Sequence, residues 1–102
     1  SIMSRPMSRN GDKCFTGHGC SFTAPVIASQ FEVTSEGKPN LRLGDKVAPH
    51  VIRVGKYCVP HRARVNRGST SVFVKGIPAA RIGDSTDKGA LYKGATTVFA
   101  GG

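Results

Sequence analysis

Cysteine and histidine are the residues of this chain with the most distinctive chemistry, and each occurs three times among the 102 residues. Their positions are Cys14, His18, Cys20, His50, Cys58 and His61. His18 lies between two cysteines, and Cys58 and His61 have a Cys-x-x-His spacing. Thiolates and imidazoles at short spacings are typical ligands of structural zinc sites. The sequence therefore indicates a metal site, although spacing alone does not decide which of these side chains converge.

The cysteines also allow uses other than metal binding. An odd number leaves at least one thiol outside any set of disulfides. The start of the chain shows no secretory signal pattern, so we expect a reducing compartment, in which thiols bind metals more often than they cross-link. Cys14 and Cys20 nevertheless remain open as metal ligands or as a surface disulfide. A catalytic pair of Cys58 and His61 is disfavoured, because no third orienting group is evident and so short a chain hardly forms a pocket.

A repeated motif must supply the elements that position these residues. Pro-x-x-Arg-x-Gly-Asp occurs three times, at residues 6–12, 39–45 and 78–84. A block of β-branched and aromatic residues bounded by glycine recurs at 68–76 and 94–102, and a degenerate copy lies at 29–37. Such blocks predict short strands, and Val72-Phe73-Val74 followed by a two-residue turn and then Ala79-Ala80-Arg81-Ile82 predicts a β-hairpin. We expect the repeated Arg and Asp residues to fix the turns.

The composition supports a turn-rich β protein. The chain has 13 Gly and 6 Pro, and no segment shows a sustained helical period, so long helices are not expected. No apolar run approaches the ~18 residues that cross a bilayer. Only 38% of the residues are hydrophobic, which predicts a small core that a metal, a disulfide or a partner must support. Three similar units predict one all-β domain with approximate three-fold symmetry, and such a chain mates with a trimer more naturally than with a dimer.

These repeats resemble those of the PAAR-repeat proteins, whose name is present literally at Pro78-Ala79-Ala80-Arg81. The resemblance extends from about residue 6 to residue 102. It implies a small conical all-β fold of short strands and hairpins. It also implies a structural function without enzymatic activity, as the pointed tip of a membrane-piercing spike on a contractile phage tail or a type VI secretion system. The base of the cone is expected to cap the blunt end of a trimeric β-helical spike protein, with one chain per trimer.

The resemblance also implies a zinc ion near the vertex, which related proteins hold with three histidines and one cysteine. His18 follows Asp12 by six residues and His50 follows Asp45 by five, so the two histidines occupy equivalent places in the first two repeats. The third repeat has Asp87-Lys88-Gly89 at that place and no histidine. The remaining ligands must then come from elsewhere. We therefore expect the ligands to be His18, His50, Cys58 and His61.

The net charge of +9 admits three interpretations. A solvated basic face would keep a β protein soluble, and a basic face would also be attracted to the anionic surface of a target cell. A small zinc-stabilised nucleic-acid-binding module is the alternative function, but the scattered aromatic residues form no evident stacking platform. We expect no nucleic-acid partner and only transient contact with the target envelope.

Domain boundaries and location follow from the same resemblance. Residues 6–102 are expected to form a single domain, and residues 1–5 a disordered start or a cloning remnant. We expect synthesis in the bacterial cytoplasm and a final place at the tip of a virion tail or of a secretion apparatus.

Overall fold

A computed structural model describes residues 4–102. This part of the protein is built from short strands. The strands are β1 (Arg5–Pro6), β2 (Lys13–Phe15), β3 (Thr23–Ile27), β4 (Thr34–Ser35), β5 (Lys38–Pro39), β6 (Lys46–Val54), β7 (Tyr57–Arg64), β8 (Phe73–Val74), β9 (Ile77–Pro78) and β10 (Phe99–Ala100). The described residues contain no helix, which confirms the all-β class. Accordingly, they include no helix that could span a membrane.

The Arg-x-Gly-Asp part of each repeat forms the same turn. In the three copies the Asp N–H donates to the Arg carbonyl at 3.0, 3.1 and 3.0 Å. The intervening glycine has a φ of +85°, +90° and +92°, as the third position of a type II turn requires. The Asp carboxylate in turn accepts the Arg backbone N–H at 2.8, 2.9 and 2.7 Å. The motif therefore recurs within the chain because each copy closes one turn.

A closed ring of backbone hydrogen bonds relates the three repeats. Leu41 donates to the Ser8 carbonyl, Ala80 donates to Leu41, and Ser8 donates to Ala80, each at 3.0 Å. These three residues occupy the third position of their repeats and are fully buried, each with 0% of its surface exposed. The ring returns to its starting residue after three steps, so the expected pseudo-three-fold symmetry is present.

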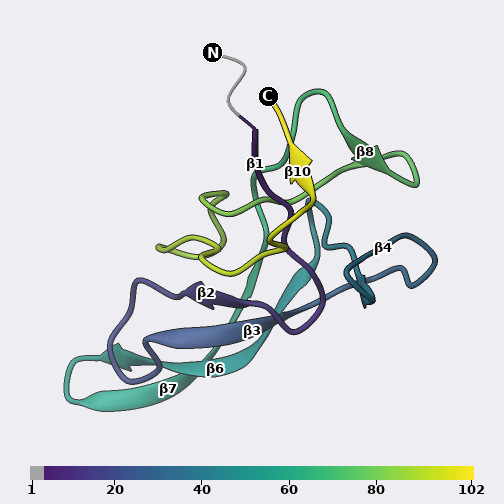
Figure 1. Cartoon of the computed structure of the whole chain (residues 1–102). Coiled ribbons are helices and arrows are strands. Elements are labelled where there is room, and N and C mark those ends of the chain that lie inside the picture. The colour runs from purple at the N-terminus through teal and green to yellow at the C-terminus, as the bar shows by residue number, and fades with distance from the viewer. Residues whose placement is uncertain (1–3) are drawn as a thin grey trace.

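Three two-stranded elements surround this ring. β4 pairs with β5, and β8 pairs with β9, each through a two-residue turn with two positive φ values, as in type I′ hairpins. The third pair joins β1 and β10, the first and last strands, where Arg5 is the register partner of Ala100, so this pair has no connecting turn (Figure 1). Arg5 takes part in this pairing, and the expected domain bounds of 6–102 stay a prediction. Of residues 1–5, residues 1–3 lie outside the described part.

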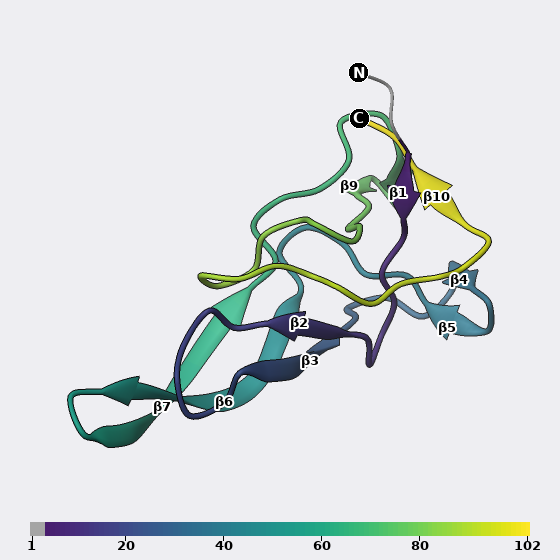
Figure 2. The ribbon, with the colours of Figure 1, turned by 60° about the vertical axis from the view of Figure 1, so that its left-hand side comes forward.

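The longest strands form a separate antiparallel sheet of order β2-β3-β6-β7. The β6–β7 hairpin projects from the repeats, and the molecule narrows toward it in both views, with overall extents of 41 × 30 × 22 Å (Figures 1 and 2). The register of this hairpin shifts between Val47 and His50 at an irregularity. This sheet, rather than the hairpins around the ring, carries most of the histidines.

Small side chains fill the interior. One cluster lies between the ring and the large sheet and comprises Cys14, Ala24, Val26, Leu41, Val47, Val65, Ala80 and Leu91. A second comprises Met7, Val74, Ala79 and Ala100. Val26, Val65 and Leu91 are equivalent in the three repeats, because each donates its N–H to the carbonyl of the repeat Asp. The core is as limited as the composition predicts, and polar turns organise much of the fold.

Candidate metal centre

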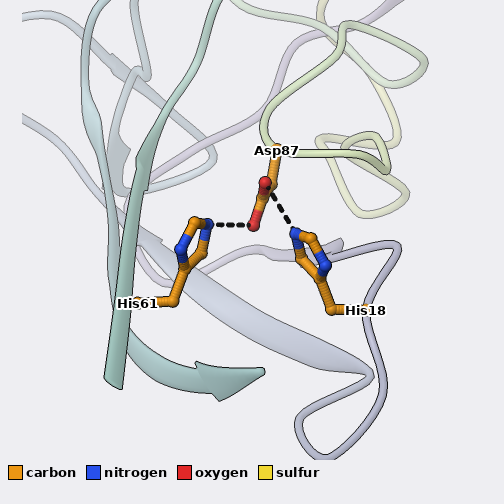
Figure 3. Close-up of side chains that lie close together, drawn as sticks. All are labelled: His18, His61 and Asp87. Atoms are coloured by element: carbon orange, nitrogen blue, oxygen red, sulfur yellow. Dashed lines mark hydrogen bonds and ion pairs between the residues drawn. The ribbon is translucent and has the colours of Figure 1, made fainter. Parts of the chain in front are cut away.

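Three histidines from three different segments converge on one carboxylate. His18 lies in the loop between β2 and β3, His50 on β6 and His61 on β7. Their Nε2 atoms lie 2.9, 3.4 and 2.8 Å from the carboxylate oxygens of Asp87, which is in the segment between β9 and β10. Figure 3 shows His18 and His61 on opposite sides of this carboxylate. The ligand atoms of His18, His61 and Asp87 all lie within 4.8 Å of one another, a spacing that suits a metal ion.

The β6–β7 ladder positions two of the histidines. His50 and His61 are register partners, so their side chains leave the same face of the sheet. Their ring centroids are 5.3 Å apart and meet edge to face. The His18 ring packs against His61 in a similar way, with a centroid distance of 5.1 Å. The sheet therefore fixes the separation of two imidazoles before any ion binds.

The loop that carries His18 is held by backbone contacts. Gly19 accepts a hydrogen bond from the Arg53 N–H on β6 at 3.1 Å, and Ser21 donates to Val51 at 3.0 Å. Gly17 has a φ of +76°, and a Cβ atom at this position would lie 2.4 Å from the Lys88 carbonyl carbon. A glycine is required here because the loop approaches the segment of Asp87 so closely. This approach brings His18 to the carboxylate.

Hydrogen bonds define which nitrogen each imidazole presents. His50 Nδ1 lies 2.9 Å from the Ala48 carbonyl, and donation to this oxygen would leave Nε2 of the neutral ring free to bind a cation in place of its hydrogen bond to Asp87. His61 Nε2 is buried and makes no hydrogen bond of acceptable geometry, although the Asp87 carboxylate is 2.8 Å away. A cation bound among these groups would satisfy this nitrogen. The donor set of imidazole nitrogens and one carboxylate is one that zinc accepts.

The electrostatics of the cluster favour an ionised carboxylate. Burial of Asp87 is the largest effect and opposes its ionisation, but the hydrogen bonds from His18 and His50 and the charges of His61 and His18 together outweigh it. The pKa of Asp87 therefore lies below its ordinary value. An ionised carboxylate at neutral pH is the form that binds a cation.

The family comparison agrees with the repeat geometry. The family model described as PAAR motif matches residues 16–93, which is most of the chain. The chain belongs to the PAAR family. Membership associates the protein with the structural tips of spikes. No curated protein matches the sequence.

The structure brings together three of the four ligands predicted for this PAAR protein. His18, His50 and His61 converge, but Cys58 forms a disulfide with Cys20 and offers no thiolate. The prediction of Cys58 as a ligand is therefore wrong for this structure. Cys58 and His61 both lie on β7, three residues apart, and an odd separation along a strand places side chains on opposite faces. The Cys-x-x-His spacing suits a loop better than a strand.

Asp87 is a candidate ligand that the sequence analysis did not predict. It follows Asp84 in the third repeat, at the place that corresponds to His18 and His50 in the first two repeats. The third repeat thus carries a carboxylate where the first two carry an imidazole. A carboxylate is also a zinc ligand, so the equivalent position makes Asp87 the counterpart of the two histidines.

Of the two cysteines left open as metal ligands or as a surface disulfide, Cys20 pairs with Cys58 and Cys14 is free. The Cys20–Cys58 disulfide joins residues 38 positions apart and links the His18 loop to the hairpin of His50 and His61. Cys14 is the free cysteine, and it belongs to the core with 0% of its surface exposed. Burial raises the pKa of its thiol. A Cys14–Cys20 disulfide is therefore excluded, and Cys14 packs as a small apolar side chain.

Proposed function

We propose that this PAAR protein is the pointed tip of a membrane-piercing spike, with its vertex stabilised by a structural zinc ion. In this function the chain caps the blunt end of a trimeric β-helical spike protein, and one chain binds each trimer. The observation that carries the proposal is the closed three-step ring formed by Ser8, Leu41 and Ala80. Through it a single chain offers three similar faces to a three-fold partner.

Exposed side chains on the two-stranded elements support the capping step. Phe73 on β8 and Phe99 on β10 occupy equivalent positions in two repeats, and they are 55% and 51% exposed. Thr34 on β4 has the corresponding position in the degenerate block at 29–37 and is also exposed. A symmetric set of half-exposed side chains is suited to burial against a partner, because each aromatic ring would remove apolar area from water.

The zinc ion would be held by His18, His50 and His61 through Nε2 and by the Asp87 carboxylate. When bound, zinc supplies a structural cross-link that in small domains contributes about 10 kcal/mol of apparent folding free energy. The four residues belong to segments far apart in the sequence, so this cross-link would join the loop, the hairpin and the third repeat. Four protein ligands fill a tetrahedral zinc site, which leaves no position for catalysis.

The proposed location is the tip of a phage tail or of a secretion apparatus, after synthesis in the bacterial cytoplasm. In that case the Cys20–Cys58 disulfide would form once the tip reaches an oxidising environment. Cysteines that pair only after export are compatible with a chain folded around zinc in the cytoplasm.

The test of capping is the stoichiometry of a complex with a trimeric β-helical spike fragment. Native mass spectrometry of the mixture is expected to show one chain for each trimer. The variant Phe73→Asp with Phe99→Asp is expected to lose the complex, and Phe22→Asp, which changes an exposed aromatic residue outside the hairpins, is expected to keep it. Three chains per trimer, or no complex, would contradict the proposal.

A further inference from the structure

Two like charges face each other on the large sheet. Lys46 on β6 and Arg64 on β7 are register partners, so their side chains leave the same face, with Cβ atoms about 5 Å apart. Arg62 lies two residues earlier on β7 and therefore shares that face. Like charges directly opposite each other destabilise a sheet. The arrangement has a cost that nothing in the local strand pairing offsets.

No carboxylate neutralises these cations among the described residues. The ion pairs of Lys and Arg in the structure involve Arg5, Arg9, Lys75 and Arg81. Arg64 donates instead to the Gly44 carbonyl at 3.1 Å. The two nearby carboxylates are already engaged, since Asp45 accepts from Ser29 and the Arg42 backbone, and Asp87 faces the histidines. The positive charge is therefore available to an external anion.

The three cations line a cleft of about 610 Å³, here named the basic cleft, which His61 and Asp87 of the metal centre line as well. An adjoining hollow of about 410 Å³ shares Ile27, Lys46 and Arg64 with it and adds Leu43. Ile27 and Leu43 are 45% and 37% exposed. The cationic wall thus continues into an exposed apolar wall, and the site has the character of an amphipathic groove.

We propose that the basic cleft binds the phosphate group of an anionic lipid, with the lipid's apolar part lying along Ile27 and Leu43. Guanidinium groups form paired hydrogen bonds with phosphate oxygens, and an ammonium group adds a point charge. A bound phosphate would relieve the repulsion between Lys46 and Arg64. The apolar wall favours a lipid over free phosphate, since inorganic phosphate gains nothing from exposed aliphatic side chains. The lipid source rests on the proposed function in membrane piercing, whereas the phosphate site does not.

The experiment measures binding of the zinc-loaded full chain to phosphatidylcholine vesicles with and without phosphatidic acid. Binding is expected only with phosphatidic acid. The variant Lys46→Gln with Arg64→Gln is expected to bind about 100-fold more weakly, since each charge-assisted hydrogen bond lost to the phosphate costs a factor of about ten. The matched control Lys13→Gln with Lys38→Gln removes the same charge from exposed residues outside the cleft and is expected to lose far less.

Several outcomes would overturn the inference. Equal losses in the two double variants would show diffuse attraction by net charge rather than a site. Equal binding to pure phosphatidylcholine would remove the need for an anionic headgroup. Competition by inorganic phosphate at a matched phosphate concentration would exclude the lipid as the source. The single variant Arg62→Gln leaves Lys46 and Arg64 in place. It is also expected to weaken binding, so the proposal does not depend on the folding of the double variant alone. Because vesicle binding needs no spike trimer, its failure is distinguishable from a failure of capping.

Discussion

His50 and His61 are register partners across β6 and β7, and both present Nε2 to the same carboxylate of Asp87. The sheet thus fixes two imidazoles through backbone hydrogen bonds, whereas His18 and Asp87 come from loops that reach the sheet separately. A cluster of this kind is only partly preorganised. Zinc would bind by joining elements that the polypeptide already holds near one another.

Asp87→Asn tests whether the carboxylate is a ligand. The amide keeps the shape of the side chain but removes its charge, so we expect zinc affinity to fall by a factor of at least about 10. Competition with a chromophoric zinc chelator measures the affinity. Glu32→Gln is the matched control, because Glu32 is an exposed carboxylate that pairs with Lys75 and lies outside the cluster. An unchanged affinity in Asp87→Asn would exclude Asp87 from the site.

Removal of zinc tests whether the metal is structural. We expect the chelated protein to melt at a clearly lower temperature and to recover when zinc is restored, because binding free energy of a structural ion is folding free energy. Differential scanning calorimetry with and without chelator makes the measurement. A melting temperature that does not respond to chelator would leave the cluster as an ordinary ion pair of Asp87 with its histidines.

The repeats could be read from the sequence because each performs a local task. Arg-x-Gly-Asp closes its own turn, and the block at 68–76 contains the turn residues of its hairpin, so spacing sufficed to predict this hairpin and the three-fold symmetry. The roles of Cys58 and Asp87 depend on tertiary placement. The strand conformation of β7 directs Cys58 away from His61, and the partner of Cys58 comes from a loop 38 residues earlier. No local pattern specifies such a pairing.

Cys20→Ser with Cys58→Ser separates the disulfide from the metal site. The bond closes a long loop, so its loss is expected to destabilise the protein by about 3 kcal/mol in denaturant unfolding. Zinc binding is expected to persist at one ion per chain, with lower affinity because the His18 loop loses its link to β7. Cys14→Ala serves as a control for the loss of a sulfur atom outside the bond. A double variant that binds no zinc would restore Cys58 as a candidate ligand.

The hydrogen bonds of Glu36 make the stability of the protein depend on pH in the acid range. Hydrogen bonds from Thr97 and then Thr96 lower the pKa of this carboxyl from 4.5 to about 2. A depressed carboxyl pKa stabilises the fold above the unfolded pKa of 4.5, and this contribution disappears as the pH falls toward about 2. The difference in unfolding free energy between the wild type and Glu36→Gln should therefore be constant above pH 4.5 and shrink below it. Urea unfolding across this range measures the difference, and the comparison cancels the acid sensitivity of the histidines. A difference independent of pH would contradict the hydrogen-bonded carboxylate.

Two glycine variants separate the cost of an unfavourable φ from the cost of a clash with a neighbouring segment. Only Gly17, next to His18, lies near the metal centre. Gly44 and Gly17 have φ values of +90° and +76°, but a Cβ atom at Gly44 would meet no atom within 4 Å, whereas at Gly17 it would lie 2.4 Å from Lys88. Gly44→Ala is expected to cost about 1 kcal/mol through its φ alone. Gly17→Ala adds a clash with backbone, so a cost of at least about 3 kcal/mol is expected.

The two variants should also differ in metal binding. Gly17→Ala must displace either the His18 loop or the segment of Asp87, so zinc affinity is expected to fall together with stability. Gly44→Ala lies in the second repeat turn and should leave zinc affinity unchanged. Denaturant unfolding and chelator competition on the same samples give both quantities. Equal stability losses, or an unchanged zinc affinity in Gly17→Ala, would show that the approach of Gly17 to Lys88 does not position the site.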